Sequence, residues 1–181
     1  MKQVRLVLML SIAILLLSGC DKLKEKRFST TIPYDFEVEI TEGVSTQVDM
    51  SGELTSLINE ELNKVKEDIQ RYELVSIEYK IWEFYGNTPN TFAGTLGFGN
   101  ANATEPGVIH EYNDIDLQAG SDSQNRVKMN LNSQDIARIQ QYFMDTNGMK
   151  MFFKGDVTSA PVHFKMQLIV NIDAIAEVEK K

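Results

Sequence analysis

The sequence predicts a mainly β protein, an antiparallel β-sandwich with two short amphipathic helices. In the last segment every even position from Val162 to Val178 is apolar, and only the two-residue period of a sheet produces such a run. Other segments alternate apolar and polar residues between turn residues, which is typical of strands with one solvated face. Only two stretches follow helical spacing, so helices are a minor part of the fold.

The first half of the folded chain predicts two strands and a helix. Apolar and polar residues alternate over 32–40, and we expect 44–50 to be the hairpin partner of this strand. A helix over 54–69 follows, with Ser51 as its N-cap, because apolar residues recur at intervals of three and four. The residues with this spacing are Leu54, Leu57, Ile58, Leu62, Val65 and Ile69.

The middle of the chain predicts two strand pairs separated by a loop. Residues 75–81 alternate in the same way, and 91–98 is the expected hairpin-like partner. The stretch 99–114 is rich in Asn, Gly and Ala, as loops are. Two further segments, 114–118 and 126–131, should form the second pair around a turn that contains Gly, Ser and Asp.

The last part of the chain predicts the second helix and the final two strands. The helix begins near Asn132 or Ser133, and Asn147 with the glycine after it is a C-cap signal. The two helices should cap an open end of the sandwich or fill a crossover connection. A strand over 149–154 then precedes the final strand, which would be about 55 Å long if straight. We therefore expect a bend or a bulge near 171–174.

Length and composition exclude several classes of protein. The chain has 181 residues, of which 43% are hydrophobic and 24% charged, and its net charge is −8. These values are typical of a single globular domain, and the negative charge argues against binding to nucleic acid backbones. The single cysteine excludes an internal disulfide framework and a Cys-rich zinc module.

The beginning of the chain has the features of an export signal. Lys2 and Arg5 form a short basic start, and residues 6–17 are apolar apart from one serine. This run suits the apolar region of a signal peptide, and it is shorter than the roughly 20 residues that a membrane-spanning helix needs. The sequence Leu17-Ser18-Gly19-Cys20 follows at once.

These four residues resemble the lipobox of bacterial lipoproteins: Leu, a small residue, Gly or Ala, then Cys. The resemblance implies that the Cys20 thiol, a strong nucleophile as thiolate, carries a diacylglycerol. It also implies cleavage between Gly19 and Cys20 and an N-acyl chain, such as palmitate, on the new amino group. Each buried CH₂ contributes about 0.8 kcal/mol, so two or three chains anchor the protein to its membrane. No other cofactor is expected.

The lipobox divides the chain into three parts. Residues 1–19 are the expected signal peptide, 20–27 the acylated cysteine with a polar tether, and 28–181 a single β-sandwich domain. The resemblance implies a location in the cell envelope, and we expect the outer membrane. The inner membrane is the alternative, because Asp21 resembles a retention signal of enterobacterial-type sorting.

A second, less specific resemblance covers 130–178. Asn132-Ser133 opens a short helix, the segment 153–157 follows, and Ala160-Pro161 leads into the long alternating strand. This order resembles bacterial lipoproteins with all-β exported domains. The resemblance implies no catalytic residue, so it adds to the fold prediction alone.

Acidic residues gather near one predicted turn and are the weak candidates for a metal site. Glu111, Asp114, Asp116 and Asp122 offer the hard oxygen ligands that Ca²⁺ prefers. Their spacing does not match an EF-hand loop. A solvated strand followed by a turn explains the same residues, so no metal is the expected outcome.

Trp82, Phe84 and Tyr85 form the candidate ligand surface. The strand that begins at Val75 buries its odd positions, so Trp82 and Phe84 should emerge on its polar face. Exposed aromatic rings on such a face suit a glycan or peptide ligand. A bulge that flips the register, or a helix over this face, would bury them instead, and we favour burial.

Three classes of function remain open. The leading expectation is a lipid-anchored envelope lipoprotein whose domain binds an envelope protein or glycan, or supports structure, without catalysis. The alternative is an envelope hydrolase that uses carboxylates or a bound cation, in which His110, Asp114 or Asp116 would meet a second acidic group in a deep pocket. His110 and His163 match no catalytic motif. The third is a lipid carrier with an apolar cavity under the 54–69 helix.

Overall fold

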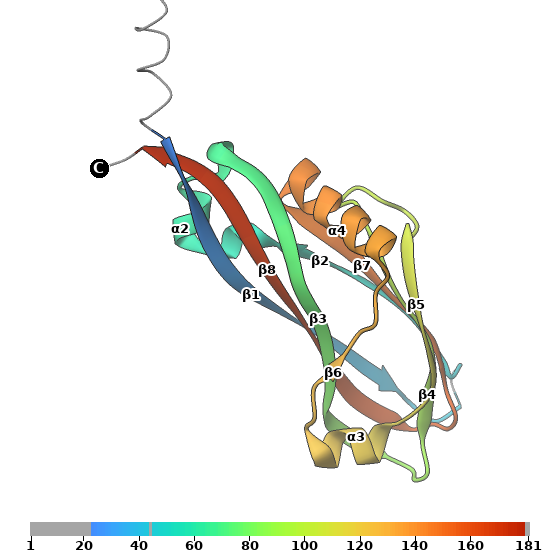
Figure 1. Cartoon of the computed structure of the whole chain (residues 1–181). Coiled ribbons are helices and arrows are strands. Elements are labelled where there is room, and N and C mark those ends of the chain that lie inside the picture. Colours follow the sequence, from blue (N-terminus) through green and yellow to red (C-terminus); the bar gives the residue numbers. More distant parts are fainter. Residues whose placement is uncertain (1–22, 44, 180–181) are drawn as a thin grey trace, which may run out of the picture.

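The structure is a computed structural model that describes residues 23–43 and 45–179. It contains two four-stranded sheets that face each other, with all strand pairs antiparallel (Figure 1). This confirms the predicted mainly β fold and its sandwich architecture. The described residues do not include the expected signal peptide 1–19, with Gly19 at its cleavage site, or the expected lipid anchor Cys20. Within the described ranges, no helix has both the length and the apolar composition needed to cross a membrane.

Sheet A has the strand order β1-β8-β3-β6. Its three long strands have 18 residues each, and β1 pairs with β8 without any register shift. The even positions predicted from the final segment are the inner face of β8, where Phe164 and Leu168 are fully buried. The strands of sheet A are β1 (Leu23–Ile40), β8 (Val162–Glu179), β3 (Ile69–Gly86) and β6 (Val127–Lys128).

Sheet B has the order β2-β7-β4-β5. Gly94 of β4 lies opposite Gly155 of β7, and a Cβ at either position would approach the Phe92 ring to 2.7 Å. The two glycines therefore leave room for the Phe92 ring, which is buried against the sheet. The strands of sheet B are β2 (Gln47–Thr55), β7 (Gly148–Val157), β4 (Thr91–Gly99) and β5 (Val108–Asp116).

Aromatic rings from both sheets meet in the centre of the core. Phe153 of sheet B lies 5.1 Å from Phe36 and 6.4 Å from Phe164, both of sheet A, measured between ring centroids. Phe92 lies 4.6 Å from Phe153 within sheet B. These tilted and edge-on contacts are the arrangements that aromatic pairs prefer, and they hold the two sheets face to face.

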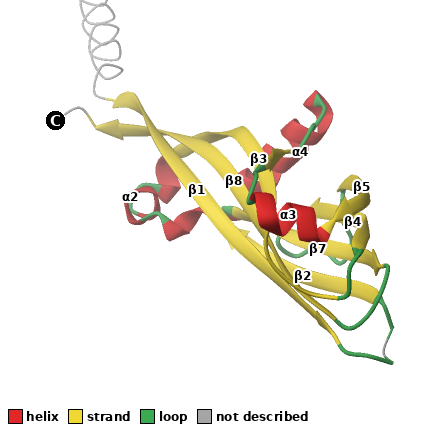
Figure 2. Ribbon diagram, turned by 90° about the horizontal axis from the view of Figure 1, so that it is seen from below, coloured by secondary structure: helices red, strands yellow, loops and turns green. Residues whose placement is uncertain are grey.

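Two helices close one side of the sandwich (Figures 1 and 2). The helix predicted to start near residue 132 is confirmed: Asn132 caps it by accepting hydrogen bonds from two backbone amides, and Asn147 ends it in the left-handed conformation. This helix contacts β3 and β7, and a shorter helix contacts β3 and β5. They are α4 (Ser133–Thr146) and α3 (Leu117–Ser123).

The predicted helix over 54–69 is wrong. Strand β2 continues through Thr55 because it pairs with β7 up to Gly148, and Ser51, the expected N-cap, is a residue of that strand. Asn59 starts a single helical turn instead, and the side chain that turn buries is Leu62. The segment consists of a 3-10 turn (Ser56–Ile58), α2 (Glu60–Asn63) and a second 3-10 turn (Lys66–Asp68).

The predicted hairpin pairings are also wrong. Strand β1 pairs with β8, at the far end of the chain, and the segment expected as its partner joins sheet B. Strand β4 pairs with β5 and β7 and lies in the other sheet from β3. The expected loop 99–114 contains most of β5. The segment 114–118 passes from β5 into α3, and β6, within 126–131, pairs with β3.

Two features of sheet A differ from expectation: the residue at which β1 begins and the place of the irregularity expected in β8. Residues 23–27, expected in the tether, are the first residues of β1 and pair with the end of β8. The pairing of β8 with β1 runs through 171–174 without a register shift. Opposite these residues the register shifts in β3 instead, between Leu74 and Ser76, and this is one of three such shifts in β3. A bulge on one strand lets both strands curve together.

Candidate functional site

A bulge in β3 separates the three aromatic residues of the candidate ligand surface. The register with β8 shifts between Ile81 and Glu83, so Trp82 is the extra residue. After the shift Phe84 lies opposite Phe164 and packs against the core, whereas Tyr85 lies on the outer face with 64% of its surface exposed. The bulge therefore turns Phe84 inward and Tyr85 outward, the reverse of the sides that an unbroken alternation would give them.

Trp82 is half-buried beneath a lysine. The Lys165 ammonium lies 5.1 Å from the centre of the Trp82 ring, which is a cation–π contact. The Trp82 backbone carbonyl accepts a hydrogen bond from Gln124 at 3.0 Å. The indole nitrogen is buried and has no hydrogen-bond partner among the described residues. Trp82 therefore lies at the edge of the outer surface, and its ring is partly covered.

Charged side chains link β1, β8 and β3 across the outer face beside Trp82. Lys165 of β8 lies 2.8 Å from Glu83 and 3.5 Å from Glu37. The hydrogen bond to Glu83 is the main reason that the pKa of Lys165 is raised. The pKa of Glu37 is lowered, mainly by its hydrogen bond with His163 at 3.1 Å. Both residues therefore keep their charges at neutral pH.

Tyr85 stacks on His163 across the two strands and borders a shallow cavity of about 270 Å³. Glu39, Thr41 and Pro161 also line this cavity. An exposed phenol ring beside an imidazole and a carboxylate offers an apolar plane and hydrogen-bonding groups to one ligand. We call the group formed by Glu37, Trp82, Glu83, Tyr85, His163 and Lys165 the Tyr85–His163 surface.

Sequence reasoning found part of this surface and missed its charged members. Trp82, Phe84 and Tyr85 were singled out as a cluster, with Trp82 and Phe84 expected on the polar face, but the register shift packs Phe84 against the core and puts Tyr85 on the outer face. Glu37 and Lys165 were missed because they lie on strands far apart in the sequence, and alternation shows which face a residue occupies but not its neighbour on that face. The available signal was the two-residue spacing of the outward polar side chains in β1 and β8, which occupy odd-numbered positions.

The acidic residues named as weak metal candidates have separate structural roles. Asp116 caps α3 by accepting a hydrogen bond from the Ala119 amide. Asp122 accepts a hydrogen bond from the Gln118 side chain at 2.8 Å, and Asp114 adopts a left-handed backbone conformation at the end of β5. Across residues 23–43 and 45–179, no three His, Cys, Asp or Glu side chains are grouped as metal ligands.

His110 lies against an aromatic ring on β5. Its ring is edge-on to Tyr112 at 5.0 Å, and Tyr112 is in turn edge-on to Tyr79 at 4.9 Å. Partial burial lowers the pKa of His110, and deeper burial raises the pKa of Tyr112. Glu111 points to the opposite, solvated face. The structure therefore places His110 with aromatic residues and does not bring Glu111 to it.

Comparisons with known proteins identify no family for this chain. No protein-family model matches it, and no curated protein matches it. Among solved structures, it is similar to a chain of Desmodium yellow mottle tymovirus, with 12% identity over 85% of both chains and a TM-score of 0.34. A chain from a Turnip yellow mosaic virus structure at 100 K has 9% identity over 86% of this chain and 98% of that chain, with a TM-score of 0.31. Both similarities are too low to assign the chain to a family.

Proposed function

We propose that this chain is a lipid-anchored lipoprotein of the bacterial cell envelope whose β-sandwich binds an envelope glycan without catalysis. The lipobox-like residues ending in Cys20 support the anchor. Strand β1 begins at Leu23, so two residues separate the fold from Cys20, and the three steps between them span about 11 Å at most. The domain is then held directly at its membrane, with its residue-23 end nearest the lipid.

The exposed Tyr85 ring stacked on His163 is the observation that supports the binding role. His163 pairs with Glu39 near the end of β1, whereas Leu23 pairs with Glu179 at its beginning. The Tyr85–His163 surface is therefore about 50 Å along the strand from the proposed anchor. An aromatic plane with flanking polar groups, carried at the far end of a rigid sheet, suits contact with a glycan layer beyond the membrane.

The anchor is tested by fractionating cells that express the wild-type chain, Cys20→Ala or Gly19→Ala. The wild-type protein should sediment with membranes and incorporate a fatty-acid analogue. Cys20→Ala should lose the label, because the alanine side chain has no thiol. Gly19→Ala is the matched control, since Ala at this position keeps the lipobox pattern and should retain the label. Equal labelling of Cys20→Ala and wild type would refute the anchor.

A further inference from the structure

A second cavity lies at the opposite end of the molecule, where β1 begins. Its volume is about 480 Å³, within the range of about 300–1,000 Å³ that is common for small-molecule sites. It lies between sheet A and the segment that contains α2. Its apolar lining comes from Phe28 of β1, Val65 of the α2 segment and Val178 of β8, and three lysines, Lys24, Lys26 and Lys64, surround these side chains.

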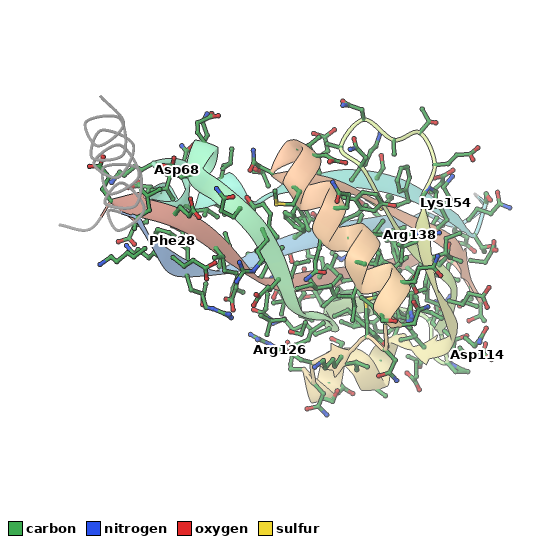
Figure 3. All side chains as sticks on the ribbon, turned by 45° about the horizontal axis from the view of Figure 1, so that its top comes forward. Phe28, Asp68, Asp114, Arg126, Arg138 and Lys154 are labelled. Carbon is green, nitrogen blue, oxygen red and sulfur yellow. The ribbon has the colours of Figure 1, made fainter. Side chains whose placement is uncertain are left out.

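Two of these lysines occupy positions that bury the core elsewhere in the same strand. Lys24 and Lys26 are at even positions of β1, on the face that buries Phe28, Ile32 and Phe36 further along. Here sheet A extends beyond the strands of sheet B, and α2 lies beneath it (Figures 1 and 2). Figure 3 shows Phe28 at this end of the molecule. The lysines thus line the open end of the sandwich from inside.

Among the residues that the structure describes, no carboxylate forms an ion pair with any of the three lysines. Elsewhere on sheet A, Arg27 and Arg71 are held by carboxylates within 3.2 Å. In the part of the chain that the structure describes, Lys24, Lys26 and Lys64 form no ion pair within 4.0 Å, although Glu61 and Glu179 line the same cavity. The Lys26 ammonium instead lies 4.5 Å from the centre of the Phe28 ring.

We propose that this cavity binds the headgroup of an anionic phospholipid. The lipid phosphate would lie among the three ammonium groups, and the first methylenes would cover the apolar lining. Charge complementarity supports this occupant, because unpaired lysines attract an anionic membrane surface. The proposal rests on the proposed anchor, since Leu23, which is half-exposed and pairs with Glu179 at the cavity, is three residues from Cys20. Such a site would orient the domain on the membrane that holds it.

The test titrates the full chain, purified in dodecylmaltoside micelles, with dihexanoyl phosphatidylglycerol and with dihexanoyl phosphatidylcholine. Wild type should bind the anionic lipid saturably and more tightly than the zwitterionic one. The triple variant Lys24→Gln, Lys26→Gln, Lys64→Gln should weaken binding by about 100-fold, from about 1 kcal/mol per lysine at a lipid surface. The matched control, Lys80→Gln, Lys128→Gln, Lys150→Gln, removes the same charge elsewhere and should bind as wild type does.

Each remaining outcome decides against the proposal. Absence of saturable binding, equal affinity for the two lipids, or equal loss in the two triple variants would overturn it. Inorganic phosphate that binds as tightly as phosphatidylglycerol would show a general anion site and would also overturn it.

Cys20→Ala should bind the lipid as wild type does, because the lining residues begin at Lys24. Fatty-acid labelling, by contrast, reports on the anchor alone, so failure of one proposal is distinguishable from failure of the other.

Discussion

Tyr85 and His163 stack across β3 and β8, with ring centroids 5.8 Å apart and ring planes within 12° of parallel. The imidazole is held from its other side by Glu37, whose carboxylate lies 3.1 Å from Nε2. One face of the Tyr85 ring is therefore supported by a side chain that is itself fixed. This arrangement reduces the conformational entropy that a ligand would have to remove on binding the exposed ring.

Replacing Tyr85 by alanine should weaken binding of soluble peptidoglycan fragments by about tenfold, the size of one good aromatic contact. Trp82 is the single tryptophan of the chain. Because it lies beside Lys165 on this surface, its fluorescence can report on binding as the fragments are added. Val75→Ala is the control, since Val75 is also exposed on β3 but lies away from Tyr85. Unchanged affinity in Tyr85→Ala would remove this surface as the glycan site, and binding of an envelope protein there would then be the next hypothesis.

Lys165→Gln should expose Trp82 to solvent and loosen the outer face. The substitution removes the ammonium from above the indole ring and leaves Glu83 and Glu37 without their shared cation. Acrylamide quenching of tryptophan fluorescence should increase, and the thermal midpoint should fall. Lys165→Arg keeps the charge and should keep both properties close to wild type. If Lys165→Gln and wild type quench equally, the lysine does not cover the ring.

Substitutions of Leu62 and Ile58 distinguish the observed turn structure from the helix that amphipathic spacing predicts. Leu62 is fully buried, whereas Ile58 is 63% exposed. Leu62→Ala should lower the free energy of unfolding by about 2–5 kcal/mol, and Ile58→Ala should change it by less than about 0.5 kcal/mol. Urea unfolding measures both. A continuous helix over 54–69 would bury both side chains, so similar losses would contradict the observed structure.

That comparison also shows where periodicity misleads. Leu54 belongs to the alternation of β2, and Leu62 and Val65 belong to a short turn segment, yet together they have the spacing of one helix face. Periodicity describes neighbours along the chain and carries no information on the β7 backbone that extends β2 to Thr55. By contrast, β8 was predicted correctly because its alternation continues over a whole strand, too long for coincidence.

Strand pairing and the composition of the candidate site depend on contacts that local patterns do not contain. Glu37 and Lys165 are neighbours only because β1 pairs with β8, a pairing of the two ends of the domain. The register shift at Trp82 reverses the sides that simple alternation gives to Phe84 and Tyr85. The sequence leaves a bulge open as an alternative, but a single extra residue leaves no mark on composition, so its position could not be predicted. The sequence therefore pointed to Trp82 and Tyr85 as candidates, but not to the side of the strand on which Tyr85 lies or to the charged partners of either residue.

Asn132, the N-cap of α4, should contribute measurably to the free energy of unfolding. Its side chain accepts hydrogen bonds from the Gln134 and Asp135 amides, both at 2.9 Å. Asn132→Ala should cost about 1 kcal/mol of unfolding free energy. Asn132→Asp keeps an accepting oxygen and should remain close to wild type, measured by chemical unfolding. Equal destabilisation by both substitutions would show that the cap is not the source of the loss.

His110 should make the folded state less stable as the pH falls below neutrality. Burial lowers its pKa below the ordinary 6.5 in the folded chain, so the unfolded chain binds the proton first. Stability is therefore complete above pH 6.5 and declines as the pH falls through the lowered pKa. His110→Gln should remove the decline that begins at pH 6.5. The separate loss below pH 4.5, where Glu25 and Glu37 have lowered pKa values, should remain. Thermal midpoints measured across this pH range report both losses of stability. If His110→Gln keeps the wild-type slope between pH 6.5 and pH 4.5, His110 is not the source of the first loss.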